Sequence, residues 1–201
     1  KYIYDTLKDI ILEPKSELNF NNNFELIIAV LLSAQCTDKR VNMITPKLFE
    51  KYDTCYKLAE ADLLDVEEII KPCGFYHNKA KNIIALSRKL VDNFNGEVPS
   101  TMEELITLDG VGRKTANVVL AVAFDKPAIA VDTHVHRVSN RLGLSKSNDV
   151  YKIEHDLMKA FDRKDWAEVH HLILLFGRYY CKSQNPKCDG CKFFDICTYK
   201  K

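Results

Sequence analysis

The sequence predicts an all-α protein, and three observations lead to this prediction. Glycine and proline are few, at seven and six in 201 residues. Apolar side chains recur every three or four residues along most of the chain, and β-branched residues rarely alternate with polar ones. With 46% hydrophobic and 28% charged residues, the chain is globular and long enough for one or two domains with cores of their own.

In the first half of the chain, helical patterns cover residues 2–12, 24–34 and 38–52, one or two short pieces within 55–71, and a stretch that ends at residue 94. The polar segment Asn19–Asn23 can cap the second of these helices, and Thr37 or Asp38 can cap the third. Pro46 is expected to kink or restart the third helix. Gly74 is expected to be a left-handed helix stop.

In the second half, helices are expected over residues 101–108, 113–124, 133–142, 148–161 and 166–180. Thr101 and Glu104 have the spacing of a capping box. Asp132 can cap the helix that follows the short apolar link 128–131. Ser147 or Asn148 is expected to open the next helix. Asp125-Lys126-Pro127 stops a helix and indicates a domain boundary.

Residues 108–115, Leu-Asp-Gly-Val-Gly-Arg-Lys-Thr, lie between two of these helices, which leaves room only for a tight hairpin. Gly110 and Gly112 tolerate positive φ and allow a ligand to approach the backbone closely. Helix N-termini have unpaired N–H groups that suit phosphate. We therefore expect a nucleic-acid backbone to bind here, at Gly110, Val111, Gly112, Arg113 and Thr115.

The net charge of +1 does not by itself indicate a nucleic-acid partner, but the charge distribution is uneven. Residues 177–201 carry six basic and two acidic side chains, whereas residues 60–68 are acidic. This asymmetry favours one basic face. The longest apolar run, 26–32, is too short to span a membrane, and no secretory signal is apparent. We expect a cytoplasmic monomer without membrane contact, associated with the nucleoid if the source is bacterial.

Four of the seven cysteines lie near the C-terminus with the spacing Cys-x6-Cys-x2-Cys-x5-Cys, namely Cys181, Cys188, Cys191 and Cys197. Three kinds of site are compatible with this spacing: two disulfides, a four-cysteine zinc site or a [4Fe-4S] cluster. The asymmetric spacing has only one Cys-x2-Cys pair, so the cluster is favoured. Lys187 and Lys192 lie in the same loop, where they can face phosphate.

Lys114 and Asp132 are the candidate reactive pair. The positive end of the helix dipole and the charge of Arg113 both favour a neutral, nucleophilic lysine amine. Asp132 can accept a proton or stabilise a developing sugar cation. Two simpler readings stay open at this point. Lys114 can be a phosphate contact only, and Asp132 an N-cap only.

Three further segments accompany the hairpin and the cysteines. These segments are Leu32-Ser33-Ala34-Gln35-Cys36-Thr37-Asp38, Val131-Asp132-Thr133-His134 and Gly177-Arg178-Tyr179-Tyr180-Cys181. Together, and in this order along nearly the whole chain, they resemble the endonuclease III family of DNA glycosylases, with its helix–hairpin–helix and Gly/Pro-Asp motif. The combination is highly specific for that family.

The resemblance implies a fold of two helical domains with the active-site cleft between them. Residues 16–126 would form a six-helix barrel with the helix–hairpin–helix. Residues 1–15 and 127–201 would form the iron–sulfur domain. Cys181, Cys188, Cys191 and Cys197 would hold a [4Fe-4S] cofactor.

The resemblance also implies an activity, that of a bifunctional glycosylase and abasic-site lyase. The substrate would be duplex DNA with oxidised pyrimidines or abasic sites. Lys114 would form a Schiff base at C1′ and Asp132 would assist it. Gln35 would fill the hole left by the extruded nucleotide, and Phe75 would wedge against the opposite strand. A core position for Phe75 stays equally open.

Asp109 departs from the family pattern, because proline usually stands there. A carboxylate beside a phosphate-binding hairpin should weaken DNA binding unless it points away or holds a cation. Two other functions compete with the main one. A monofunctional adenine or thymine mismatch glycosylase is disfavoured by Lys114, which such members generally lack. A non-catalytic DNA-binding protein with a zinc-stapled tail would be colourless.

Overall fold

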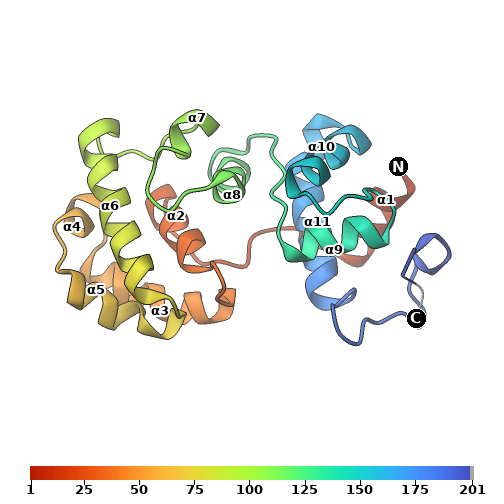
Figure 1. Ribbon diagram of the computed structural model, residues 1–201, viewed down its shortest axis with the longest axis horizontal. Coiled ribbons are helices and arrows are strands. Elements are labelled where there is room, and N and C mark those ends of the chain that lie inside the picture. The colour runs from red at the N-terminus through yellow and green to blue at the C-terminus, as the bar shows by residue number, and fades with distance from the viewer. Residues whose placement is uncertain (200–201) are drawn as a thin grey trace. The chain divides into compact units, whose positions relative to one another are not determined.

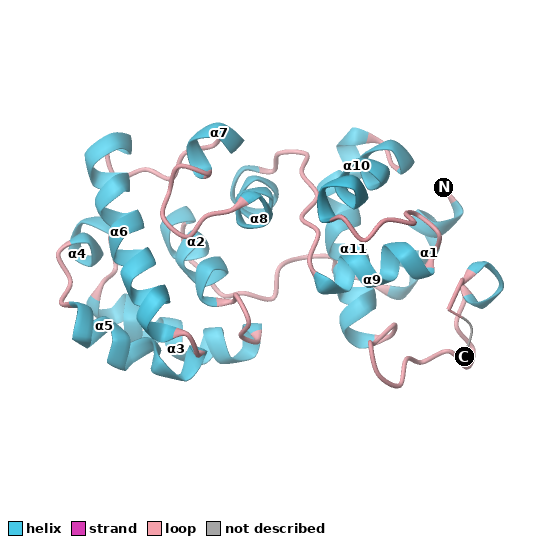
Figure 2. Ribbon diagram, viewed as in Figure 1, coloured by secondary structure: helices cyan, strands magenta, loops and turns pink. Residues whose placement is uncertain are grey.

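The computed structural model describes residues 1–199, and every regular element in that range is helical (Figure 2). The all-α prediction is therefore confirmed. The α-helices are α1 (Tyr2–Ile10), α2 (Asn23–Leu32), α3 (Asp38–Lys51), α4 (Cys55–Ala59), α5 (Leu63–Ile70), α6 (Tyr76–Phe94), α7 (Met102–Leu105), α8 (Arg113–Phe124), α9 (Thr133–Arg141), α10 (Val150–Ala160) and α11 (Trp166–Tyr179). Short 3-10 turns follow α5, precede α11 and lie at Phe194–Ile196.

The chain folds into two compact units, one of Glu17–Phe124 and one of Lys1–Ser16 with Asp125–Lys201. The expected domains are 16–126 and 1–15 with 127–201. Their boundaries differ from those of the two observed units by one residue at the first division and by two residues at the second. The assignment of a six-helix barrel and an iron–sulfur domain to these parts stays a prediction. No helix within residues 1–199 is long and apolar enough to cross a membrane.

Helix α2 is the centre of the Glu17–Phe124 unit. Every residue from Phe24 to Leu32 is buried, because the helix is apolar nearly all round. It packs against α3, α6 and α8, and α6 also packs against α4 and α5 (Figure 1). The side-chain oxygen of Asn22 accepts a hydrogen bond from the N–H of Glu25 and caps α2, as the polar segment before it predicts.

Helix α11 is the centre of the other unit. Its apolar side chains pack against α1 and α9 in a core that includes Leu7, Val135, Leu172 and Phe176. Phe193, from the cysteine-bearing loop, is 1% exposed and belongs to the same core. The loop is therefore anchored by an aromatic side chain, independently of its cysteines.

Two local expectations are corrected, and one of the two outcomes expected at Pro46 is excluded, because helix α3 continues through Pro46 without restarting. Asp149, not Ser147 or Asn148, caps α10, and its carboxylate accepts a hydrogen bond from the N–H of Lys152. Gly74 has φ 68° but an extended ψ, so it is not left-handed helical. That conformation occurs one residue later, at Phe75.

Candidate functional site

The hairpin between α7 and α8 is a tight turn. The N–H of Val111 donates to the carbonyl oxygen of Leu108 at 3.1 Å, and both side chains are buried, which anchors the turn in the core. Gly110 has φ +76°, and an added Cβ there would lie 2.9 Å from the side-chain nitrogen of Asn82. Glycine is therefore required at position 110 by both conformation and space.

Gly112 differs from the expectation. Its φ is not positive, and an added Cβ would meet nothing within 4 Å. The protein itself thus has no need of glycine at position 112. An exposed, bare backbone directly before α8 leaves space for a ligand to approach the N-terminal N–H groups of that helix.

Lys114 lies in the first turn of α8 and is exposed, while Arg113 and Thr115 on either side are half-buried. The amine therefore follows directly on the turn that exposes backbone N–H groups. A cation in the first turn of a helix, where the helix dipole is positive, is suited to an anionic ligand such as a phosphate.

Asp132 is the N-cap of α9 and belongs to the other unit. Its Oδ1 accepts a hydrogen bond from the N–H of Val135 at 2.7 Å, and the side chain is half-buried. The capping role is thus real. A carboxylate has a second oxygen, so this one hydrogen bond leaves it able to accept others.

Arg137, which sequence reasoning missed, links the middle of α9 to α11 and to the segment that follows α11. Its guanidinium donates to the carbonyl oxygens of Gly177 at 2.8 Å and Cys181 at 3.0 Å, and it lies 3.1 Å from Nδ1 of His134. Burial lowers the pKa of His134 and so disfavours its charged form, and a neutral ring whose Nδ1 carries no proton can accept from Arg137. Sequence spacing does not reveal this role of Arg137, because the two carbonyl groups that it joins to α9 lie 40 and 44 residues away.

Gln35 and Phe75 share two uncommon properties. Both are exposed, and both have positive φ, 52° and 50°, although neither is glycine. Phe75 is 67% exposed, so its interpretation as a core aromatic is wrong. Backbone in this region costs free energy and occurs preferentially at functional sites. An exposed phenylalanine beside such a turn is a suitable wedge for stacked bases.

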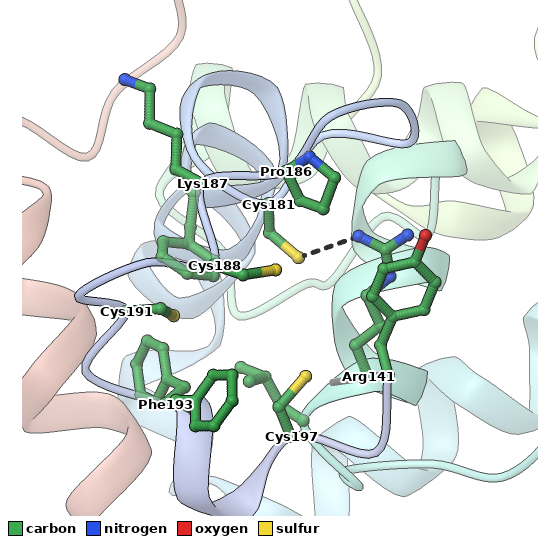
Figure 3. Close-up of a pocket in the computed structure, with 12 residues that line it drawn as sticks. Arg141, Cys181, Pro186, Lys187, Cys188, Cys191, Phe193 and Cys197 are labelled. Atoms are coloured by element: carbon green, nitrogen blue, oxygen red, sulfur yellow. Dashed lines mark hydrogen bonds between the residues drawn. The ribbon is translucent and has the colours of Figure 1, made fainter. Parts of the chain in front are cut away.

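Cys181, Cys188, Cys191 and Cys197 line one small pocket, with a cavity volume of about 20 Å³ (Figure 3). Apolar side chains, including those of Leu142, Phe176 and Phe193, complete its wall. Burial raises the pKa of the Cys191 thiol, and the charges of the other three cysteines raise it further. Four thiolates so close together repel one another, and bound metal cations would relieve that repulsion.

Arg141 closes one side of this pocket, as Figure 3 shows. It is buried, and its Nη1 donates to Sγ of Cys181 at 3.3 Å and to the carbonyl oxygen of Lys182 at 2.8 Å. Its guanidinium also stacks on the Tyr199 ring, 3.6 Å from the centroid. A fixed positive charge beside the sulfur suits a thiolate ligand.

Comparison with known proteins shows what this set of features corresponds to. Residues 28–163 match the HhH-GPD superfamily of base excision DNA repair proteins. Endonuclease III of Bacillus subtilis is 46% identical over 98% of this chain and 90% of its own length. Endonuclease III of Escherichia coli K12 is also 46% identical, over 94% of this chain and 89% of its own. The chain belongs to the endonuclease III family.

A solved structure agrees with this assignment. A trapped covalent intermediate of endonuclease III with DNA superposes with a TM-score of 0.95 at 48% identity, over 98% of this chain and 93% of that one. As a member of the endonuclease III family, the chain is a DNA glycosylase and abasic-site lyase of base excision repair. DNA is its partner.

Within this endonuclease III fold, the two loop lysines differ in surroundings. Lys187 extends away from the cysteine pocket, and its amine lies 5.0 Å from the centroid of the Tyr180 ring (Figure 3). Lys192 is exposed but lies 3.7 Å from a carboxylate oxygen of Asp9, which partly neutralises it. Lys187 is therefore the better placed of the two for a phosphate contact.

Proposed function

We propose that this chain removes oxidised pyrimidines from duplex DNA and then cleaves the strand at the abasic site, with Lys114 as the nucleophile. The exposed Lys114 amine, directly after the phosphate-binding turn of α8, is the observation that carries the proposal. A DNA backbone held by the hairpin N–H groups would bring a deoxyribose to this amine.

The proposed reaction proceeds in two stages. The Lys114 amine attacks C1′, and the base leaves with the electron pair of the glycosidic bond and takes up a proton. The C1′–O4′ bond of the adduct then breaks, O4′ takes up a proton, and C1′ and Nζ are joined as a Schiff base. Loss of a proton from C2′ then expels the 3′ phosphate by β-elimination. Asp132 is proposed to take up the amine proton and to stabilise the positive charge that develops on the sugar.

DNA would be held by the hairpin residues and distorted by two side chains. Gly110, Val111 and Gly112 are proposed to offer the backbone, and Arg113 and Thr115 to assist them. Gln35 is proposed to fill the space of the extruded nucleotide and Phe75 to separate the opposite bases. Their exposure and backbone conformation support these roles.

A [4Fe-4S] cluster is the proposed cofactor, held by Cys181, Cys188, Cys191 and Cys197. These four cysteines would hold the cluster, because four cysteine thiolates are its usual ligand set and all four line one pocket. The cluster would shape the loop and carry Lys187 to DNA, and the reaction steps do not use it.

We further propose that the protein acts as a monomer on duplex DNA with damaged or abasic sites. The protein would be located in the cytoplasm, where it would be associated with the nucleoid if the cell is bacterial. The bacterial origin of the similar proteins supports this location.

Borohydride trapping tests the proposed function. One duplex carries thymine glycol and a second carries an abasic site. A covalent adduct on both is expected for the native chain and none for Lys114→Gln, while Lys159→Gln, a change at an exposed lysine on α10, traps normally. An adduct on the abasic duplex alone would contradict the proposed excision of oxidised pyrimidines and leave only the lyase activity. No adduct on either would overturn the nucleophile assignment.

A further inference from the structure

One buried amine joins the turn that holds Gln35 to the turn that holds Phe75. Nζ of Lys79, on α6, donates to the carbonyl oxygens of Leu32 and Cys73, each at 3.0 Å. Leu32 is the last residue of α2, three residues before Gln35. Cys73 ends the 3-10 turn two residues before Phe75. The two segments are 40 residues apart in sequence and share this contact.

Burial of this amine has a free-energy cost. Lys79 is only 7% exposed, and removing an ammonium from water is unfavourable unless it is well hydrogen-bonded. Burial lowers the pKa of Lys79, and the nearby thiols of Cys73 and Cys36 act in the opposite direction. An apolar side chain would avoid this cost at an ordinary core position. The presence of a buried amine at this position is therefore best explained by the hydrogen bonds to its two carbonyl acceptors, which lie just before the two turns.

The carbonyl acceptors also have a specific character. Leu32 lies in the last turn of α2, where backbone carbonyls lack intrahelical partners and the helix dipole is negative. A cation there stabilises the helix end and defines the direction in which the chain leaves it. Beyond each acceptor stands an exposed residue of positive φ, Gln35 or Phe75. Such conformations persist only when their surroundings hold them.

We infer that Lys79 is a positioning residue for base extrusion. Its ammonium sets the spacing between the Gln35 turn and the Phe75 turn, so that both side chains enter the duplex as one unit. Lys79 is buried and touches no DNA itself. This inference rests on the proposed function of Gln35 and Phe75 and adds the residue that couples them.

A double-mutant cycle tests the coupling. Lys79→Met shortens the unbranched side chain by one atom and removes its donors. We expect single-turnover excision of thymine glycol to slow about tenfold, because small misplacements of catalytic geometry have large effects on rate. In a Gln35→Ala/Phe75→Ala background, the same Lys79→Met change should alter the rate by less than about twofold.

One control variant and one substitute for Lys79→Met make the result decisive. Lys57→Met removes an exposed lysine of the same unit and should leave the excision rate unchanged. If Lys79→Met does not fold, as judged by circular dichroism, Lys79→Gln, which keeps an N–H donor, is assayed in the same cycle.

Two outcomes would overturn the inference: an excision rate equal to that of the native chain, or an equal slowing in both backgrounds. Failure of the proposed function itself is distinguishable, because the native chain would then give no borohydride adduct.

Discussion

Asp109 and Lys89 face each other beside the hairpin, with Oδ2 of the aspartate 3.6 Å from Nζ of the lysine. Lys89 lies on α6, and its amine also donates to the carbonyl oxygen of Thr107 at 2.5 Å. The carboxylate that stands where the family usually has proline is therefore paired with a cation. Its repulsion of DNA phosphate is reduced, although both side chains are partly exposed and the pair contributes only about 1 kcal/mol or less.

This pairing predicts the effect of Lys89→Gln on DNA binding. The change leaves Asp109 unpaired beside the phosphate site and should weaken binding of an abasic-site duplex about two- to fivefold, and more strongly at low salt. The double variant Lys89→Gln/Asp109→Asn should regain most of the affinity. Fluorescence anisotropy at two salt concentrations measures both. Equal losses in the single and the double variant would show that Lys89 binds DNA directly.

Substitutions at Asp132 separate its capping role from its charge. Asp132→Asn keeps an oxygen that can accept from the N–H of Val135, so unfolding free energy should change by only a few tenths of a kcal/mol, whereas Asp132→Ala should lose about 0.5–2 kcal/mol. Base excision should fall strongly in both. Urea unfolding and single-turnover excision provide the two readouts. An Asn variant that excises at the native rate would reduce Asp132 to a cap.

Loss of one cysteine ligand should remove the proposed cluster. For Cys188→Ser we expect a colourless protein, a less stable C-terminal region and weaker DNA binding, because metal binding contributes to the folding of its site. Visible absorbance, hydrogen exchange of residues 181–199 and binding assays measure these effects. Cys55→Ser is the matched control. Cys55 lies in the Glu17–Phe124 unit, where its thiol donates to the carbonyl oxygen of Gly96 in the same unit. Full stability and activity of Cys188→Ser would show that the loop needs no metal.

Acid should destabilise the protein through His171. Burial lowers the pKa of this imidazole, whose Nδ1 bonds the carbonyl oxygen of Ala167 at 2.9 Å. Below pH of about 6.5, the unfolded chain binds a proton that the folded chain resists, so unfolding free energy falls between pH 7.5 and 5.5. His171→Gln should reduce this slope in urea unfolding.

His155→Gln is the control for the acid effect. His155 also faces the carbonyl oxygen four residues before it, at 2.9 Å, but it is exposed. Comparing the slope of this variant with that of His171→Gln separates burial from the hydrogen bond that both rings make. An equal reduction of slope in both variants would attribute the effect to the hydrogen bond and not to burial.

Local sequence determined the helices and several of their ends. The caps at Asn22, Thr37 and Asp132 all lie where the sequence predicts them. Apolar periodicity and capping residues act within one or two turns, so a single sequence reports them directly. The spacing of the four cysteines also predicted that they belong together, and in the structure they line one pocket.

Tertiary structure alone decided which side chains are buried or paired across long stretches of sequence. Phe75 is exposed and Lys79 is buried, the reverse of what their chemical types suggest. Asp109, in the hairpin turn, has a partner on α6, and the amine of Lys79 reaches a carbonyl 47 residues away. No periodicity or spacing encodes such contacts, because they depend on how helices pack. The hairpin and its lysine could thus be found from the sequence. The hydrogen bonds of Lys79 that join the Gln35 turn to the Phe75 turn could not.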